Sequence, residues 1–474
     1  MNTALRNGVL LSSVIYLTFL VAIGCKRDGA PSTDTEATRP MDSYHATGPL
    51  ALSDPALNPR EWLIKALFKG YQNTGRTNVA WDSIVEPAFE AYADYTRVSR
   101  TNWPSLEKAL AALATSPCDD PMIQYMRVRY REVVQSNATM ASQLGEAHDA
   151  MLLSKYHPLF KFVAGVRAVE AARSADRNSS RTDRIQQVTS ALELLARDTN
   201  APVDEVFDAA SMWLNHHDSK AWIEYVTHNL NGILQQNWGA TERWLRFQGE
   251  AEIMRAWVER GGGWATAVTV QGWDGFREHL AKAEDLLTRA WNINPTNAQT
   301  AYLMMRVELG QGKGRERMET WFARAMSFET NHYDAVELMS FYLEPRWHGS
   351  VEESLKFARA CVQSEKWGGQ VPLVLAKVHH SLATYLNLTN SPAYWQRPEV
   401  WPDIQSSYEK FFTLSPNAAG WRHDYASDAY YCGQYSVFLE QTKLFAYGTN
   451  YDFFGGKDEF EKMLATARKA DGNR

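Results

Sequence analysis

The stretch AEDLLTRAWNINP, residues 283–295, is repeated in outline 35 residues later by METWFARAMSFET, residues 318–330. In the first copy Ala283, Leu287 and Ala290 lie at offsets 0, 4 and 7, and a proline follows at offset 12. These offsets place the three side chains on one helical face, because residues three or four positions apart are neighbours there. A small-large-small pattern that ends in a turn predicts the second helix of a repeated hairpin.

The same spacing recurs elsewhere in the chain. The matching residues are Met318, Phe322, Ala325 and Thr330, and in a third, looser copy Tyr408, Phe411 and Pro416. A period of about 34 residues is typical of tetratricopeptide-like hairpins. Alternation of β-branched residues is confined to Val268–Val270. We therefore predict an all-α fold, a tetratricopeptide-like α-solenoid of stacked helical hairpins.

Composition is that of a folded protein, with 474 residues, 45% of them apolar and 22% charged. The net charge is −6, from 55 acidic and 49 basic residues, and no dense Lys/Arg run occurs. Nucleic acid is therefore not expected as a partner. The 17 tryptophans are interpreted as filling gaps between stacked helices, the alternative being an aromatic ligand-binding surface.

The N-terminus has the layout of a secretion signal. Arg6 precedes a largely apolar stretch over residues 9–23, and Gly24 leads into Cys25. This ending resembles a bacterial lipobox, which implies that residues 1–24 are a signal peptide and that Cys25 is the lipid attachment site. The rival interpretation is a transmembrane anchor, but the apolar stretch falls short of the roughly 20 residues that a span needs.

Residues 25–57 are rich in Ser, Thr, Asp, Pro and Ala and are predicted to form a flexible, lipidated tether. Lys26 follows the cysteine in place of aspartate, which in Gram-negative lipoproteins favours the outer membrane. We expect a lipid-anchored protein of the cell envelope that faces the periplasm or the exterior.

The folded body is divided into an N-terminal helical region at 58–240, a tetratricopeptide-like region at 241–365, and C-terminal helical repeats with a capping helix at 366–474. Asn58 is a predicted N-cap, and capping boxes are predicted at Ser83–Glu86 and Ser350–Glu353. Helices are predicted at 104–116, 121–136, 139–155, 158–176, 184–198, 203–217, 219–236 and 240–260.

Two short segments carry a family resemblance. Trp257-Val258-Glu259-Arg260-Gly261 and Pro345-Arg346-Trp347-His348-Gly349-Ser350 resemble the W-x-x-R-G and P-[KR]-W-x-G-S signatures of a bacterial domain family of unknown function with tetratricopeptide-like helices. The resemblance covers about residues 240–365, and His348 replaces the more usual glycine. It implies a helical fold and no established activity.

Three of these residues are candidates for a binding or signature role. Trp347 is interpreted as a plug against the preceding hairpin, the alternative being an exposed binding ring. Arg260 is interpreted as a charge at a helix C-terminus, the alternative being a ligand clamp. Trp257 belongs to the same segment as Arg260.

Catalytic and metal-binding motifs are missing from the sequence. The pairs His216-His217 and His379-His380 are adjacent, so each pair points in two directions and does not form a metal-binding face. Each pair is predicted to have one half-buried and one exposed histidine. Apart from Cys25, the cysteines have no metal-ligand spacing and are interpreted as buried apolar residues. No catalytic residue, metal or cofactor is predicted.

The predicted function is a membrane-anchored helical-repeat scaffold that binds a protein partner in the cell envelope. Two alternatives remain. One is a glycan-binding outer-membrane lipoprotein, which exposed tryptophans and tyrosines on one face would favour. The other is an enzyme whose active site is assembled from residues far apart in the sequence, which converging acids and histidines in a deep pocket would favour.

Overall fold

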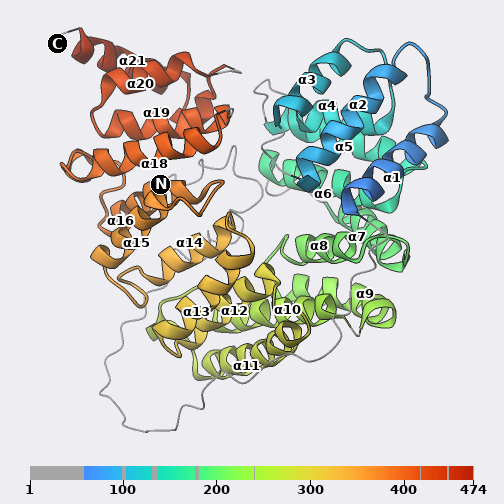
Figure 1. The fold of residues 1–474 in the computed structure, drawn as a ribbon, viewed down its shortest axis with the longest axis horizontal. Helices are drawn as coiled ribbons and strands as arrows, with labels where there is room; N and C mark the ends of the chain where they lie inside the picture. The colour runs from blue at the N-terminus through green and yellow to red at the C-terminus, as the bar shows by residue number, and fades with distance from the viewer. Residues whose placement is uncertain are drawn as a thin grey trace.

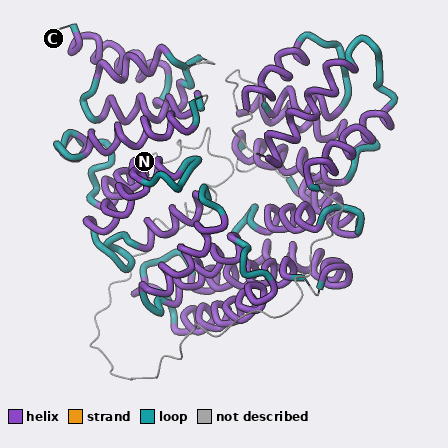
Figure 2. Tube along the Cα trace, viewed as in Figure 1, coloured by secondary structure: helices purple, strands orange, loops and turns teal. Residues whose placement is uncertain are grey.

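The computed structural model describes residues 58–98, 103–130, 137–176, 181–239, 241–416, 418–445 and 448–472. These segments consist of helices, turns and loops, and no β-strand occurs among the described residues (Figure 2). The predicted all-α class is therefore confirmed. The predicted signal peptide, the tether and Cys25 lie outside the described residues.

The helices follow a U-shaped course, with α1 to α6 in one arm, α18 to α21 in the other, and α7 to α14 across the base (Figure 1). The first nine are α1 Pro59–Thr74, α2 Asp82–Ala93, α3 Trp103–Ala114, α4 Pro121–Arg129, α5 Asn137–Leu153, α6 Pro158–Ala175, α7 Thr182–Arg197, α8 Val203–Leu214 and α9 Lys220–Trp238, with a π-helical turn η3 at Asp94–Val98. The next are α10 Glu242–Arg260, α11 Val270–Ile293, α12 Ala298–Gln311, α13 Arg315–Phe328 and α14 Tyr333–Tyr342. The last are α15 Val351–Gln363, α16 Val374–Tyr385, α17 Pro392–Trp395, α18 Val400–Leu414, α19 Arg422–Tyr431, α20 Tyr435–Lys443 and α21 Lys457–Asp471.

Side-chain caps begin several of these helices. The Asn58 side chain accepts a hydrogen bond from Arg60 N, and Ser350 Oγ accepts one from Glu353 N, so these two predicted caps are confirmed. The predicted box at Ser83 is wrong. Helix α2 already begins at Asp82, before the predicted N-cap residue Ser83, and Trp81 occupies the N-cap position without a side-chain cap.

The predicted helix 121–136 is too long, because α4 ends at Arg129. Tyr130 leaves the helical conformation with φ −111° and ψ 20°. Its ring packs edge-on against Tyr92 and Tyr95, which hold the residue toward α2 and η3. Tertiary aromatic packing therefore overrides the helical pattern at this point.

The small-large-small pattern marks the buried face of α11, α13, α15 and α18. Its buried members are Ala283, Leu287 and Ala290, then Met318, Phe322 and Ala325, then Ser354, Ala358 and Cys361, and last Ile404, Tyr408 and Phe411. The copy on α15 begins with a serine, whose Oγ donates to Leu343 O at 2.7 Å. Leu355 and Val362, which the apolar spacing suggests for the core, are instead only partly buried.

The helices pack in two layers. Each even-numbered helix from α4 to α14 contacts the next even-numbered helix. For example, α8 contacts α10, and α12 contacts α14. Among the odd-numbered helices that cover them, only α7 and α9 pack with comparable extent. Helices on the inside of a curve are closer together than those on the outside. The even-numbered layer is therefore the inner side of the curved base in Figure 1.

Helix α10 is the meeting point of the two large parts of the core. Met254 packs into the cluster that extends back to α1, and its neighbour Ile253 packs into the cluster that extends on to α19. Close contact with α11 depends on Gly249, where an added Cβ would lie 2.7 Å from Leu287 Cγ. Glycine therefore fixes the spacing of the two helices that connect the halves of the chain.

Candidate functional site

The two signature segments lie together in the fold. The rings of Trp257 on α10 and Trp347, after α14, meet edge-on with their centroids 6.3 Å apart. Phe276 of α11 lies against Trp257 at 5.0 Å, and Phe341 of α14 lies against Trp347 at 5.0 Å. The segments are some 90 positions apart in the sequence, and a single aromatic cluster joins them.

Arg260 is the last residue of α10 and is 4% exposed. Its Nη1 donates to the carbonyl oxygens of Gly261 at 3.0 Å and Gly263 at 3.2 Å. The guanidinium also lies over the rings of Trp257 and Trp273, at 5.7 and 5.2 Å. Arg260 therefore holds the loop after α10 in place, with its charge over two indoles.

Trp347 is 8% exposed and lies inside the turn that follows α14. The turn closes so tightly that a Cβ at Gly349 would lie 2.2 Å from Leu343 O. His348 stacks on Tyr342 with a centroid distance of 4.5 Å. The three signature residues Trp257, Arg260 and Trp347 thus form part of the packed interior, and the open surface lies elsewhere.

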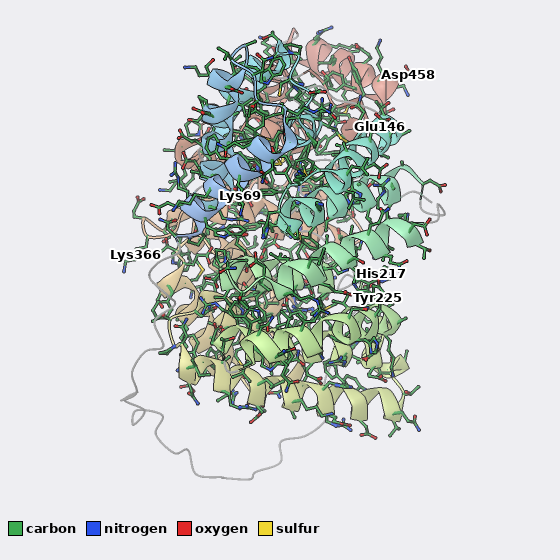
Figure 3. The ribbon with its side chains drawn as sticks, turned by 90° about the vertical axis from the view of Figure 1, so that its right-hand side faces the viewer. Lys69, Glu146, His217, Tyr225, Lys366 and Asp458 are labelled. Carbon is green, nitrogen blue, oxygen red and sulfur yellow. The ribbon has the colours of Figure 1, made fainter. Side chains whose placement is uncertain are left out.

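The adjacent histidines divide between interior and surface. His216 is 8% exposed and stacks on Trp213, whereas His217, labelled in Figure 3, is exposed. His379 is 1% exposed, with Nε2 3.0 Å from Asp403 Oδ2, whereas His380 is partly exposed, with Nε2 2.9 Å from Asp428 Oδ1. The buried member of each pair is more deeply buried than the sequence suggests.

A continuous row of charged and tyrosine side chains crosses the inner layer, and we call it the inner stripe. Its members are Arg97 of η3, Glu205 and Asp208 of α8, Arg246 and Glu250 of α10, Tyr302 and Arg306 of α12, Glu337 of α14, and Lys377 of α16. Members interact between η3 and α8, between α8 and α10, between α10 and α12, and between α14 and α16, as described next. The row therefore follows the order of the inner helices from one arm across the base.

The row begins where η3 meets α8. Arg97 donates two hydrogen bonds to the Glu205 carboxylate, which is 4% exposed. One turn further along α8, Asp208 is exposed to solvent, yet desolvation by the surrounding protein raises its pKa. Arg246 of α10 is the strongest opposing charge. This carboxyl therefore contacts solvent while the protein around it disfavours its charged form.

Glu250 occupies the middle of the row. Its Oε1 accepts a hydrogen bond from Asn215 Nδ2 at 2.7 Å and lies 4.0 Å from Arg306 Nη1. Burial raises the pKa of this carboxyl, against the opposing charge of Arg306. Tyr302, one turn before Arg306, is partly exposed, and desolvation raises the pKa of its phenol.

The row ends between α14 and α16. Glu337 is 3% exposed and pairs with Lys377, whose side chain is 37% exposed. Tyr333 lies one turn before Glu337 on α14, and desolvation raises the pKa of its phenol well above its usual range. Beyond it, Tyr408 of α18 donates to Asp428 of α19 at 2.9 Å, and both residues are buried. A buried polar contact thus joins the first two helices of the second arm.

Tyrosine and arginine are prominent among the members of the inner stripe. Tyrosine and arginine are the side chains that contribute most often to protein interfaces, because they combine a large apolar area with polar ends. The inner stripe was not predicted from the sequence. Its acids and bases occur singly, on helices that look like ordinary charged faces, and only the stacking of the helices brings them together.

Among the described residues there is no group of three or more His, Cys, Asp and Glu side chains placed to hold a metal ion. The described helices also include none that is long and apolar enough to cross a membrane. Comparison with family models, with curated proteins and with solved structures finds no match to this chain.

Proposed function

We propose that the chain is a tetratricopeptide-like α-solenoid that binds a protein partner along the inner stripe. In this proposal Cys25 carries the lipid that holds the protein in the cell envelope, and residues 25–57 give the folded body reach. The solenoid assignment is supported by the repeated buried pattern on α11, α13, α15 and α18 and by the two layers of helices.

The observation that carries the binding proposal is the environment of Asp208. This carboxyl is exposed to solvent, although desolvation by the surrounding protein raises its pKa. A partner segment that contacts it would meet Asp208 and, further along the row, the partly exposed Tyr302 of α12 and Tyr333 of α14. Extended surfaces of this kind are what stacked helical repeats offer to a partner.

The experiment is site-specific photo-crosslinking in intact cells of the source organism. A benzoylphenylalanine is placed at Met212, which is 42% exposed and lies one turn from Asp208 on the same face of α8. The matched control places the same group at Lys282, which is 52% exposed on α11 of the other layer. Crosslinked products are identified by mass spectrometry.

The expected result is one protein adduct at Met212 that is missing at Lys282 and is lost when Asp208→Lys is introduced. Adducts of equal yield at both positions, or an adduct that survives Asp208→Lys, would overturn the proposal. The glycan alternative is less well supported, because most of the tryptophans are buried or partly buried and Trp264 is the only one among the exposed large apolar residues described. Retention of envelope polysaccharide by the inner layer would restore it.

A further inference from the structure

Arg324, in the last turns of α13, has no carboxylate partner among the described residues. The guanidinium carbon of Arg324 is 4.3 Å from the ring centroid of Trp321 and 5.2 Å from that of Trp291 on α11. The two indoles meet edge-on with their centroids 5.2 Å apart. The cation is therefore held by ring faces from two helices. We call Arg324, Trp291 and Trp321 the arginine platform.

Partly buried arginines are normally paired with an acid. Within the described part of the chain, no carboxylate lies within ion-pair distance of Arg324, and no acceptor takes a hydrogen bond from it. Desolvation by burial lowers the pKa of its guanidinium, and no carboxylate raises it. On α11, Asp285 pairs with Arg289, at 3.4 Å. The donors of Arg324 are therefore left for an acceptor outside the described protein.

An exposed apolar side chain lies beside the platform. Phe328, one turn after Arg324, is 48% exposed, and its ring centroid lies 6.3 Å from that of Trp291. A planar set of hydrogen-bond donors beside an apolar side chain matches a carboxylate next to an apolar group.

We propose that the ends of α11 and α13 form a docking site for an acidic side chain of a partner protein, with an apolar partner residue beside it. The Arg324 guanidinium would bind the Asp or Glu carboxylate through two parallel hydrogen bonds. Phe328 would cover the apolar neighbour.

An acidic sugar is the less suitable occupant. Sugars stack on open ring faces, but Trp321 is only 8% exposed and the guanidinium lies over its ring. The side chain that remains open beside the platform is Phe328, whose exposed surface suits an aliphatic or aromatic side chain. The geometry therefore favours a peptide over a glycan.

This site is independent of the inner stripe. Helices α11 and α13 belong to the layer that covers the inner helices, so failure of binding at Asp208 would leave the arginine platform untouched. A single partner that reaches round the edge of the array could use both, and two partners could use one each.

The test is a peptide array probed with the purified folded protein. Its probes are short peptides, linked through their C-termini, each with one Asp or Glu beside Leu, Ile or Phe, and their Asn or Gln counterparts. Wild type is compared with Arg324→Gln and with Arg289→Gln, an exposed arginine on α11 that already has Asp285 as its partner. Wells coated with polygalacturonate report acidic-glycan binding.

The expected result is that the best acidic peptides bind wild type about tenfold more tightly than their amide counterparts, as loss of a charged hydrogen-bond pair implies. Arg324→Gln should abolish that preference, and Arg289→Gln should keep it. A preference that is missing in wild type, or unchanged by Arg324→Gln, would overturn the proposal. Binding to polygalacturonate that depends on Arg324, without binding to the acidic peptides, would also overturn it.

Thermal melting separates this role from a structural one. Because Arg324 is desolvated without an anion, Arg324→Gln should leave the melting temperature unchanged or raise it, as is common where function opposes stability. A marked fall in the melting temperature of Arg324→Gln, relative to Arg289→Gln, would show that the platform serves packing, against the proposal.

Discussion

Glu250 on α10 and Asn215 at the end of α8 are joined by a hydrogen bond of 2.7 Å between Nδ2 and Oε1. This contact ties two successive helices of the inner layer at a buried carboxylate, and Arg306 extends the tie to α12. The inner stripe therefore has two roles. Its buried members hold the inner helices together, and its exposed members are available to a partner.

Removing the Glu250 carboxylate should destabilise the protein. Glu250→Ala leaves Arg306 without its acid and Asn215 without its acceptor, and breaking a buried pair costs about 3–5 kcal/mol. Glu250→Gln, which keeps an acceptor, should cost less. Urea unfolding measures both, with the exposed Glu278→Ala on α11 as a control that should change stability by less than about 0.5 kcal/mol. Equal effects of Glu250→Ala and Glu278→Ala would contradict this assignment.

Acid should destabilise the fold through two buried histidines. Burial lowers the pKa of His148 and of His216 from 6.5 to about 4. Both are neutral in the folded protein at neutral pH. Their contribution to the free energy of unfolding is therefore fully present above pH 6.5 and is lost as the pH falls toward 4. The loss is at most about 3 kcal/mol for each histidine.

The measurement is the melting temperature at pH 7 and pH 5 for wild type and for the double variant His148→Gln, His216→Phe. Glutamine keeps an acceptor for Arg184, which lies 2.6 Å from His148 Nδ1, and phenylalanine keeps the stacking on Trp213. Glu205 and Glu250 have raised pKa values and favour the folded state in acid. The change in melting temperature between pH 7 and pH 5 must therefore be compared between wild type and the double variant. A double variant that loses as much stability as wild type would refute the prediction.

The glycines of α9 and α10 should respond in opposite directions to the same substitution. Gly249→Ala forces a Cβ to within 2.7 Å of Leu287 and should cost about 1–3 kcal/mol through overpacking. Gly232→Ala in α9 meets no atom within 4 Å and should stabilise the protein by about 0.5–1 kcal/mol, because alanine loses less entropy in a helix. Chemical denaturation of the two variants tests both values, and destabilisation by Gly232→Ala would show that the helix spacing is described incorrectly.

Lipid attachment should depend on one cysteine. Cys25→Ala should abolish incorporation of labelled palmitate and move the protein from the membrane fraction to the soluble fraction, because an acyl chain is what the proposed anchor supplies. Cys361→Ala is the control, since Cys361 is buried in α15 and the substitution only shortens a core side chain. Retention of Cys25→Ala in membranes without label would point to a different anchor.

The helical class of this chain could be predicted from the spacing of its apolar residues, and the reason is visible in α11 and α13. Their small-large-small faces are strictly periodic and are buried as predicted. The copy on α15 was missed because it begins with Ser354, whose hydroxyl is satisfied by Leu343 O. A buried polar residue with a backbone partner is indistinguishable from a surface residue in a sequence pattern.

The sites were harder to predict than the helices. Trp257, Arg260 and Trp347 could be selected by resemblance, yet their burial depends on the meeting of α10, α11 and the turn after α14. Asp208 and Arg324 carry no local signal at all. Asp208 is exposed and yet desolvated, and Arg324 has no carboxylate partner among the described residues. Both properties arise only when separate helices are packed together.

The position of α10 also restricts how this protein can change during evolution. Met254 and Ile253 are adjacent, but each is needed by a different half of the core. A recombination event that joins the first half of this gene to the second half of a divergent relative would leave α10 packed, on at least one side, against residues of the other protein. Exchange of halves is therefore selected against, and gain or loss of hairpins is expected at the chain ends, where a single neighbour has to adapt.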